Sequence, residues 1–516
     1  MHQSQVNPKV VVIGAGIGGL VAALSLASHG LDVTVVERAE GPGGKIRTTL
    51  AGQRPIDCGP TVLTMRDVFA LIFQEAGADL TSLVPMQRAE ILARHAWGPG
   101  EQFDLHADRQ RSFDAIAEFA TPAEAKRYAA FCDRAQRVFH TLDYPFMRTE
   151  RPSVLGLVKR VGLSRLGALA QISPFTTLWQ ELERSFHDPR LRQLFGRYAT
   201  YCGSSPFRAP ATLMLIAHAE QQGVWLVEGG MHKLSHALAA LVGAKGARIA
   251  YRAEARSIMT KGARINGVQL ATGEELAADI VVVNADIAAI SSGRFGPAIA
   301  DGAPRMVRGN RSLSAFTLAL ETVASGFPLV RHNVFFSRDY AAEFAHIGAG
   351  RVPTEPTVYV CAQDRGDKGA APDGNGERLF CIINAPPNGD AIQMNTTEID
   401  KCVANTINQL GRCGMTINTS RTDITVTTPA DFERLFPATG GSLYGQATHG
   451  WRSSFLRQGT RGHLPGLYLA GGSVHPGAGV PMAAISGRLA ASAVMADLAS
   501  TNRWYRVAMP GGMSTR

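Results

Sequence analysis

The chain has 516 residues, of which 45% are hydrophobic and only 18% are charged, whereas an average soluble protein has ~25% charged residues. This composition excludes an intrinsically disordered chain, and the length excludes a small disulfide-stabilised scaffold. The formal net charge of +9 is compatible with nucleic acid, an anionic membrane or an anionic cofactor, but the absence of a zinc finger, an RNP motif and a basic tract predicts no nucleic-acid partner.

Seven cysteines are scattered through the chain as single residues, with no CxxC pair. An odd number of isolated cysteines is typical of reduced thiols and argues against structural zinc, so we expect a cytoplasmic protein without a metal site. The N-terminal MHQSQVNPK also lacks the charged start of a secretory signal, which favours the same compartment.

The first predicted element is the apolar stretch from Val10 to Ala27, whose only polar side chain is Ser25. Alone it resembles a membrane span, but its glycines indicate a buried strand, a tight turn and a helix, so we expect no integral membrane protein. The glycines fit G-x-G-x-x-G, in which they permit the turn, the approach of a diphosphate to the backbone, and close packing of the helix. The candidate cofactor residues are Gly14, Gly16, Gly18 and Gly19.

A second strand, DVTVVE, follows and ends in Glu37. A carboxylate at this position accepts hydrogen bonds from both ribose hydroxyls of an adenosine and repels a 2′-phosphate, which disfavours NADP. The next segment contains Gly43 and Gly44, followed by Lys45 and Arg47. A second glycine pair with basic residues suits a cofactor that continues past the diphosphate, so we assign Gly44 and Lys45 to the same site.

Near the end of the chain, GLYLAGG (466–472) predicts a strand closed by glycines, and Pro481 suits the first turn of a following helix. Bare N–H groups at that helix terminus stabilise an electron-rich oxygen, as the pyrimidine edge of a reduced flavin requires. The end of the chain therefore returns to complete a site begun at its start. The candidate residues here are Gly471, Gly472, Gly479 and Val480.

Several segments together resemble the bacterial carotenoid desaturase family of the phytoene desaturase type, over about residues 8–498. Within that family, FGRYATYCGSSPFRAP (195–210) and the GVPMAAISG ending (479–487) are most similar to the enzymes of purple bacteria that desaturate 1-hydroxycarotenoids at the 3,4 position. The segments that carry the resemblance are GAGIGGL (14–20), PGGK (42–45), DCGPTVLT (57–64), GVWLVEGGMHKL (223–234), TPADFERLF (428–436) and LAGGSVHPGAGVPMAAISG (469–487).

The resemblance implies an α/β fold: a discontinuous Rossmann-like FAD-binding domain of the glutathione-reductase and amine-oxidase type, with an inserted mixed α+β substrate domain. We expect the FAD-binding domain to comprise residues 1–80, 225–300 and 465–500. We expect residues 81–224 to form a helical insert facing substrate and membrane, and 301–464 to form a substrate domain with an antiparallel sheet. Its hairpin should consist of 357–363 and 378–387. Residues 501–516 should form a tail, disordered over 508–516.

The implied reaction removes a hydride from an allylic carbon to flavin N5 and a proton from the neighbouring carbon of an acyclic C40 carotenoid. Gly59, Pro60 and Thr61 should lie near the flavin, as their segment does in relatives. Asp57, His475 and Arg452 are the candidate catalytic residues, and each has a structural alternative: a turn cap, a histidine bonded to backbone, and a solvated arginine. Tyr444 and His449 are candidates for the tunnel wall, and Gly472 and Ser473 for the ribitol contact.

Other functions stay open at this point. They include a phytoene desaturase, a carotenoid isomerase, a flavin amine oxidase, and an FAD-free lipid-binding protein of the Rab GDP-dissociation-inhibitor type, against which the retained glycines and Glu37 argue. The electron acceptor could be oxygen or a quinone. The segment from Arg151 to Gln180 carries four basic residues and no acidic one among many leucines. It predicts peripheral association with the cytoplasmic side of the inner membrane.

Overall fold

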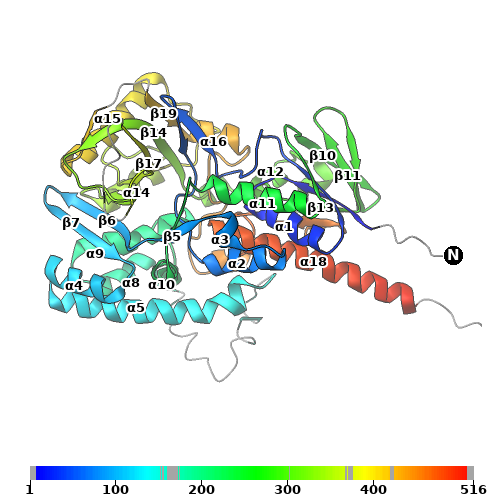
Figure 1. Ribbon diagram of the computed structural model, residues 1–516, viewed down its shortest axis with the longest axis horizontal. Coiled ribbons are helices and arrows are strands. Elements are labelled where there is room, and N and C mark those ends of the chain that lie inside the picture. Colours follow the sequence, from blue (N-terminus) through cyan, green and yellow to red (C-terminus); the bar gives the residue numbers. More distant parts are fainter. Residues whose placement is uncertain are drawn as a thin grey trace, which may run out of the picture.

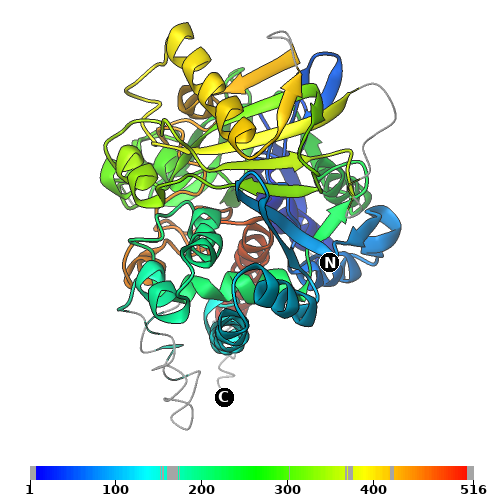
Figure 2. The ribbon, with the colours of Figure 1, turned by 90° about the vertical axis from the view of Figure 1, so that its left-hand side faces the viewer.

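The protein is described by a computed structural model (Figures 1 and 2), in which a parallel sheet, a large mixed sheet and a helical layer share the chain. This architecture confirms the predicted α/β fold class. The described residues are 7–507 except 151–152, 154–155, 158, 160–172, 174, 302, 367–368, 370–375 and 419–422, with the backbone alone for 501–507.

The nucleotide-binding part is built on a five-stranded parallel sheet, in the order β20-β13-β1-β2-β9. Its central strands are continuous runs of β-branched residues because both faces of a parallel sheet are covered. The strands are β1 (Lys9–Ile13), β2 (Asp32–Val36), β9 (Arg248–Ala250), β13 (Ile280–Val283) and β20 (Leu467–Leu469).

The two faces of this sheet carry different layers. Val10 and Val12 of β1 belong to the core shared with helices α1 (Ile17–Ser28), α11 (His232–Ala244) and α18 (Val480–Val507). Val11 and Ile13 face the other way, because successive side chains of a strand alternate. That second core includes β10 (Ala255–Lys261), β11 (Arg264–Leu270), β12 (Glu275–Ala277), α12 (Ile287–Ser291) and α13 (Pro297–Ala300).

Helix α18 is longer than predicted, since it continues to Val507 whereas the tail was expected to begin at residue 501. Its part Val480–Ser500 is the one helix among the described residues that is long and apolar enough to cross a membrane, a feature that the sequence analysis missed. It packs against α1, and a Cβ on Gly487 would lie 2.3 Å from the carbonyl oxygen of Gly18. This contact is that of a core helix. Residues 508–516 lie outside the described residues.

The large sheet has the order β18-β14-β17-β16-β15-β6-β7, with β19 also paired to β14. The expected hairpin is present as β16 and β17, which pair antiparallel. Strands β6 and β7 come from the segment expected to be a helical insert, and β6 joins the sheet by parallel pairing with β15. Most residues of β6 are buried, as suits a strand inside the sheet, and Phe103 and Leu105 of β7 are buried as well. The strands are β6 (Ile91–Gly98), β7 (Glu101–His106), β14 (Ser314–Ser325), β15 (His332–Phe335), β16 (Val358–Ala362), β17 (Glu377–Ala385), β18 (Thr416–Asn418) and β19 (Ile424–Thr427).

Helices lie on one side of this sheet, in the lower part of Figure 2. They surround a dense aromatic core that includes Tyr128, Phe186 and Phe195, all buried. The helices are α4 (Arg109–Phe119), α5 (Pro122–Leu142), η1 (Asp143–Met147), α8 (Leu178–Ser185), α9 (Pro189–Gly196), η3 (Arg197–Cys202), η4 (Ala211–Met214) and α10 (Leu215–Gln222).

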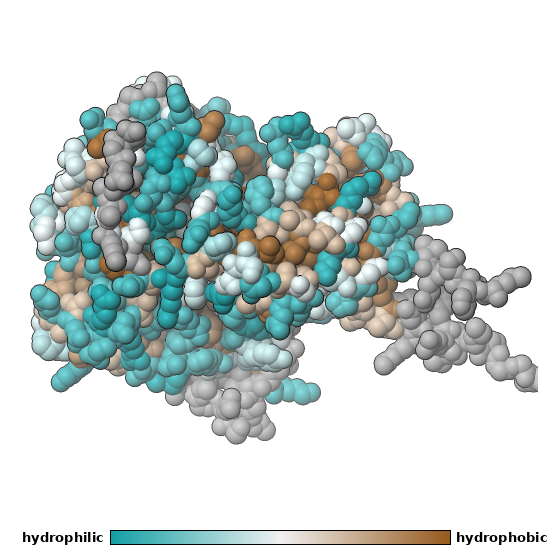
Figure 3. All heavy atoms as spheres, in the orientation of Figure 1, coloured by the Kyte–Doolittle hydropathy of each residue, from teal (hydrophilic) through white to brown (hydrophobic). Residues whose placement is uncertain are grey.

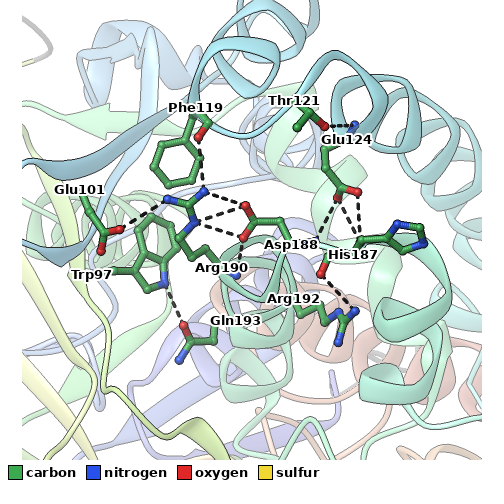
Figure 4. Close-up of polar contacts among 10 residues, drawn as sticks. All are labelled: Trp97, Glu101, Phe119, Thr121, Glu124, His187, Asp188, Arg190, Arg192 and Gln193. Atoms are coloured by element: carbon green, nitrogen blue, oxygen red, sulfur yellow. Dashed lines mark hydrogen bonds and ion pairs between the residues drawn. The ribbon is translucent and has the colours of Figure 1, made fainter.

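Polar contacts fix the start of α9 against α4 and α5 (Figure 4). Arg190 pairs with Asp188 at 2.7 Å, and its guanidinium carbon lies 4.0 Å from the centre of the Phe119 ring. The buried carboxylate of Glu124 accepts hydrogen bonds from the backbone nitrogens of His187 (3.1 Å) and Asp188 (3.4 Å). Because α9 leads directly into η3, these contacts also set the position of the residues in η3.

The remaining elements connect these layers. On the face seen in Figure 3, hydrophilic residues predominate over the large sheet and α5, and apolar residues gather near the centre, close to α2 and α3. The remaining elements are β3 (Thr48–Ala51), β4 (Arg54–Asp57), α2 (Arg66–Glu75), α3 (Leu80–Leu83), β5 (Met86–Arg88), β8 (Trp225–Val227), η5 (Arg308–Asn310), α14 (Tyr340–Gly348), α15 (Thr396–Arg412), α16 (Pro429–Leu435) and α17 (Ser453–Leu456).

Candidate functional site

A single cavity of about 1220 Å³ runs between the parallel sheet, the large sheet and the helical layer. Ordinary ligand pockets occupy roughly 300–1,000 Å³, so this cavity has room for more than one ligand. One part is lined by the glycine loops, including Gly14, Gly16 and Gly18. Another part is lined by apolar side chains of the helices, including Phe139, Leu213 and Ile216. The cavity therefore joins a polar nucleotide-like site to an apolar chamber.

The first glycine loop is shaped by close backbone contacts. Gly14 has φ +98°, which only glycine adopts readily, and a Cβ on Gly19 would lie 2.1 Å from the Gly14 carbonyl oxygen. Gly16 precedes the first residue of α1 and makes no side-chain cap, so N–H groups of the first turn remain free for a ligand. This arrangement is the one that binds a diphosphate at a helix N-terminus.

Glu37 lies at the end of β2 and lines the same cavity. Its carboxylate is buried and accepts hydrogen bonds from the backbone nitrogens of Ala15 (2.7 Å) and Ala39 (2.8 Å). A carboxylate has about four lone-pair positions, so both oxygens keep capacity for the hydroxyls of a ribose.

The second glycine pair lies directly against the first loop. Gly43 donates its N–H to the carbonyl oxygen of Ala15 (2.9 Å), and a Cβ on Gly44 would lie 3.2 Å from the Cα of Gly16. The Lys45 ammonium donates to the carbonyl oxygen of Leu443 (2.5 Å), so it bridges the loop to the C-terminal part of the chain. Burial lowers the pKa of Lys45, against the opposing influence of the Asp286 carboxylate.

The loop after β4 reaches the part of the cavity that lies next to the large sheet. Gly59, Pro60 and Thr61 all line the cavity. The Thr61 hydroxyl is 2.6 Å from the hydroxyl of Tyr359 on β16. This hydrogen bond connects the cofactor half of the cavity to the large sheet.

The C-terminal residues complete the cavity wall, because Gly471, Gly472, Gly479 and Val480 all line it. The backbone N–H of Gly471 donates to the Ser486 hydroxyl (2.8 Å), which anchors the loop to α18.

Three residues of the cavity wall were missed by the sequence analysis. The Asn284 side chain contacts the first glycine loop, and its amide nitrogen donates to the Gly14 carbonyl oxygen (3.3 Å). Oxygen Oδ2 of Asp286 is buried without a hydrogen-bond partner in the described chain. Arg457 is buried and donates to backbone carbonyls, including that of Gln446 (2.9 Å), and burial lowers its pKa. Asn284 and Asp286 come just after β13, at the carboxyl end of a strand of the parallel sheet, and this position was the available signal.

Gly472 and Ser473, predicted to contact the ribitol, both line the cavity. The Ser473 hydroxyl accepts the backbone N–H of Ile287 (3.1 Å), so it already serves as a helix cap. An acidic residue is nevertheless present beside it, since both Ser473 and Asp286 lie close to Gly445. Asp286, in the loop after β13, thus places an acidic group next to the end of the last strand.

Asp57 does not reach the cavity wall of the described chain. Its carboxylate instead accepts the backbone N–H of Met231 (2.6 Å) and lies 2.8 Å from Nδ1 of His232, at the start of α11. The carboxylate therefore contacts the N-terminus of a distant helix and is not the local turn cap named as the alternative to a catalytic role. The helix N-terminus and its unsatisfied N–H groups account for the carboxylate at this position.

His475 and Arg452 also lie off the cavity wall of the described chain. His475 is fully buried, Nε2 donates to the carbonyl oxygen of Phe146 (2.9 Å), and burial lowers its pKa to about 4. Arg452 is exposed and lies over the Trp451 ring, 5.1 Å from its centre. Both residues therefore take the structural roles that stood as alternatives.

Of the two tunnel candidates, Tyr444 lines the cavity and His449 does not. His449 accepts the backbone N–H of Ser205 (3.2 Å), and burial lowers its pKa to about 4. Tyr444 packs on Gly203, and burial raises its pKa to about 12.

Comparison with known proteins places this geometry in a family. Residues 17–495 match the model of the flavin containing amine oxidoreductases. The chain belongs to this family. As a flavin containing amine oxidoreductase family member, it is an FAD-dependent oxidoreductase.

Relatives within the family cover nearly the whole chain. The chain is 52% identical to a hydroxyneurosporene desaturase of Rubrivivax gelatinosus over 98% of its length and 97% of that protein. It is 44% identical to a hydroxyneurosporene desaturase of Cereibacter sphaeroides over 97% of its length and 100% of that protein. An oxidoreductase of Methanosarcina mazei has a similar fold, with a TM-score of 0.60 at 18% identity, over 95% of this chain and 100% of that chain.

The residues of the cavity fit FAD. A Cβ on Gly16 would lie 2.8 Å from the Asn284 amide nitrogen, so any side chain at this position would displace Asn284 from the glycine loop. Glu37 would hold the adenosine ribose, the N-terminus of α1 the diphosphate, and the buried Oδ2 of Asp286 a hydroxyl of the ribitol. The loop 59–61 and the start of α18 would flank the isoalloxazine.

Proposed function

We propose that the protein is an FAD-dependent desaturase of acyclic C40 carotenoids, which introduces the C3=C4 double bond into a 1-hydroxylated substrate such as 1-hydroxyneurosporene. The observation that carries the proposal is the continuous cavity, which joins the cofactor loops to an apolar chamber. The 52% identity to a hydroxyneurosporene desaturase over almost the whole chain supports this substrate class rather than phytoene.

The chain's own residues position and shield the substrate. When bound, the flavin supplies the acceptor for the hydride that leaves the allylic carbon. The apolar walls exclude water and hold the polyene in one register, because a misplacement of ~1 Å can lower the rate by orders of magnitude. The positive charge left on the substrate is delocalised over its double bonds, so the mechanism requires no strong base. This agrees with the placement of Asp57 and His475 away from the cavity.

We also propose that the protein docks peripherally on an anionic membrane at the cytoplasmic side of the inner membrane. A water-insoluble substrate has to pass from the bilayer into the cavity. Most of the predicted docking segment, 151–180, falls outside the described residues, but Phe175 is 79% exposed and also lines the cavity. Its ring contacts Trp451 at 5.4 Å, and Leu456 nearby in sequence is 68% exposed. These residues form an apolar rim suited to a lipid surface.

The test of the desaturase proposal is a side-by-side incubation of the FAD-loaded protein with neurosporene, 1-hydroxyneurosporene and phytoene. Oxygen and a quinone are supplied in parallel as electron acceptors, and the pigments are separated by chromatography. The 1-hydroxylated substrate should gain one double bond fastest. Equal turnover of phytoene would place the protein in another branch of the family, and conversion without a change in hydrogen count would indicate an isomerase.

A lipid-binding protein without a redox function is distinguished by the same preparation. The purified protein should be yellow with flavin absorption, and the carotenoid should bleach that absorption under anaerobic conditions. A colourless protein that binds carotenoid would contradict the proposal.

A further inference from the structure

The apolar chamber of the cavity contains a buried polar cluster, formed by Arg197, Tyr198 and Tyr201 of η3 and Glu220 of α10. Nη1 of Arg197 donates to the Tyr201 hydroxyl (2.6 Å), which donates to Oε1 of Glu220 (2.8 Å). The Tyr198 hydroxyl donates to the other carboxylate oxygen (2.7 Å). Arg197, Tyr201 and Glu220 line the cavity. A charged cluster is unexpected in a chamber that holds only a hydrocarbon.

The hydrogen-bonding capacity of this cluster is not used up by the protein. Nitrogens Nε and Nη2 of Arg197 are buried and have no hydrogen-bond partner in the described chain, and the whole residue is only 5% exposed. Burial lowers the pKa of Arg197, but the combined opposite effect of its neighbours, chiefly Tyr201 and Glu220, is larger. The pKa therefore lies above its usual value, and the guanidinium stays charged. A buried guanidinium with unpaired N–H groups is costly unless a ligand oxygen completes it.

The cluster lies near the cofactor half of the cavity. Tyr359 lines the same chamber, and its hydroxyl bonds to Thr61 in the loop 59–61. Burial raises the pKa of Tyr359, Tyr201 raises it further and Arg197 lowers it, so the cluster lies close to Tyr359. In a 1-hydroxylated substrate only C2 separates the hydroxyl-bearing carbon from the C3=C4 bond that forms. A hydroxyl-binding group for this reaction must therefore lie close to the reacting carbons, as this cluster does.

We propose that Arg197 and Glu220, coupled through Tyr201, bind the terminal hydroxyl of the substrate and so select 1-hydroxylated carotenoids. This inference rests on the proposed desaturase function. The hydroxyl would accept a hydrogen bond from Arg197 and donate one to Glu220, which uses both of its hydrogen-bonding roles. A hydrocarbon end would leave Nε and Nη2 of Arg197 without an acceptor, and sites built to bind a hydroxyl reject analogues that lack it.

The test compares the binding of 1-hydroxyneurosporene and neurosporene to the reduced holoenzyme under anaerobic conditions, where no turnover occurs. Binding is followed by quenching of tryptophan fluorescence, since Trp451 lines the cavity. The variants are Arg197→Met, Arg197→Lys, Tyr201→Phe and Glu220→Gln. The matched control is Arg192→Met, because Arg192 lies on α9, off the cavity wall, and donates to the carbonyl oxygen of Phe186 (2.9 Å).

In the wild type and in Arg192→Met, we expect preferential binding of the hydroxylated carotenoid. Arg197→Met should weaken that binding about 100-fold while neurosporene binds as well or better, and Arg197→Lys should restore part of the preference. An equal loss for both carotenoids, or an unchanged preference, would overturn the inference. If Arg197→Met does not fold, retention of the preference in both Tyr201→Phe and Glu220→Gln would overturn it equally. The proposed function is tested separately, because a wild type that turns over neither carotenoid when it is oxidised and supplied with an electron acceptor would overturn that function.

Discussion

Gly18, in the first turn of α1, lies directly against Gly471, just after β20. A Cβ on Gly18 would be 2.8 Å from the backbone nitrogen of Gly471 and 2.8 Å from Oδ1 of Asn284. Gly18, Asn284 and Gly471, which are far apart in the sequence, thus lie next to one another. They meet because β1, β13 and β20 are parallel, so that their carboxyl ends share one edge of the sheet.

The first glycine loop, which makes this contact, and the strand that ends at Glu37 give a first prediction, for FAD binding. Gly16→Val should fill the space of the diphosphate, and Glu37→Ala should weaken the adenosine contact and leave two backbone N–H groups unpaired. We expect each to raise the Kd for FAD by about tenfold or more. Flavin content per protein, measured by absorption after gel filtration, checks this. Gly243→Ala, where a Cβ meets nothing within 4 Å, is the control, and unchanged flavin content in both variants would contradict the site.

Gly203 gives a second prediction, for stability. It has φ +62°, and a Cβ there would lie 2.4 Å from the Tyr444 ring and 2.7 Å from Cβ of Ser312. Gly203→Ala should therefore lower the free energy of unfolding by about 2–5 kcal/mol, from the left-handed conformation and overpacking together. Thermal unfolding measures this loss. Gly309→Ala, with nothing within 4 Å of its Cβ, should change the Tm little, and equal Tm values for the two variants would refute the packing argument.

The third prediction concerns the ion pair of Arg365 and Glu377, joined at 2.7 Å with side chains 7% and 3% exposed. Arg365→Met leaves a buried carboxylate unpaired and should lower the free energy of unfolding by about 3–5 kcal/mol. The double variant Arg365→Met with Glu377→Leu should recover much of that stability, because it removes the unpaired charge as well. The exposed pair of Arg252 and Glu40, at 2.8 Å, is the comparison. Arg252→Met should cost about 0–1 kcal/mol. Urea unfolding of the variants measures both costs, and similar losses for both pairs would be inconsistent with the burial argument.

The fourth prediction concerns acid stability. The pKa of His475 is lowered to about 4 by burial, whereas in an unfolded chain a histidine titrates near ~6.5. The unfolded state therefore binds the proton first, and the stability from the neutral residue, complete above pH ~6.5, is lost as the pH falls toward 4. His475 should account for about 1.4 kcal/mol of lost stability at pH 5.5 relative to pH 8. Urea unfolding should show a smaller fall for His475→Asn than for the wild type, and parallel pH profiles would exclude this contribution.

The fifth prediction concerns membrane docking. Lys159→Glu, Arg160→Glu and Arg165→Glu together should reduce co-sedimentation with anionic vesicles, since each basic residue near the surface contributes ~1 kcal/mol. Phe175→Ser with Leu456→Ser should reduce it as well, even at high salt where charge attraction is screened. Leu50→Ser is the control, because Leu50 is also exposed but lies on β3. If all of these proteins partition equally at low salt, the docking surface lies elsewhere.

The parts of the site that are local in sequence were predictable. The turn of Gly14 and Gly16, the strand that ends at Glu37 and the helix begun by Pro481 each depend on a few consecutive residues, and their motifs carry a geometric meaning. The resemblance also led to the correct family, because glycine-rich segments at both ends occur together.

The polar residues could not be assigned in this way. Asp57 and His475 lie next to cofactor motifs in the sequence, but their side chains point to α11 and to the Phe146 carbonyl. Arg197 lies in the segment 195–210 that carries part of the resemblance, but nothing in that segment indicates that its side chain faces a cavity. Arg457 carries no motif, and both residues enter the cavity wall through tertiary packing. Which side chain faces a cavity depends on contacts between elements hundreds of residues apart, and such contacts leave no periodic signal in one sequence.

The contact between α1 and α18 also bears on how the protein matures. A ribosome releases the GxGxxG segment long before it has made the last strand and helix. Until β20 and α18 arrive, the nascent chain holds only half of the wall around its cofactor. Long-range pairing of this kind is slow to form and leaves apolar surface open in the meantime. Cofactor loading should therefore follow translation, and a generous supply of FAD at that moment should raise the yield of folded protein by mass action.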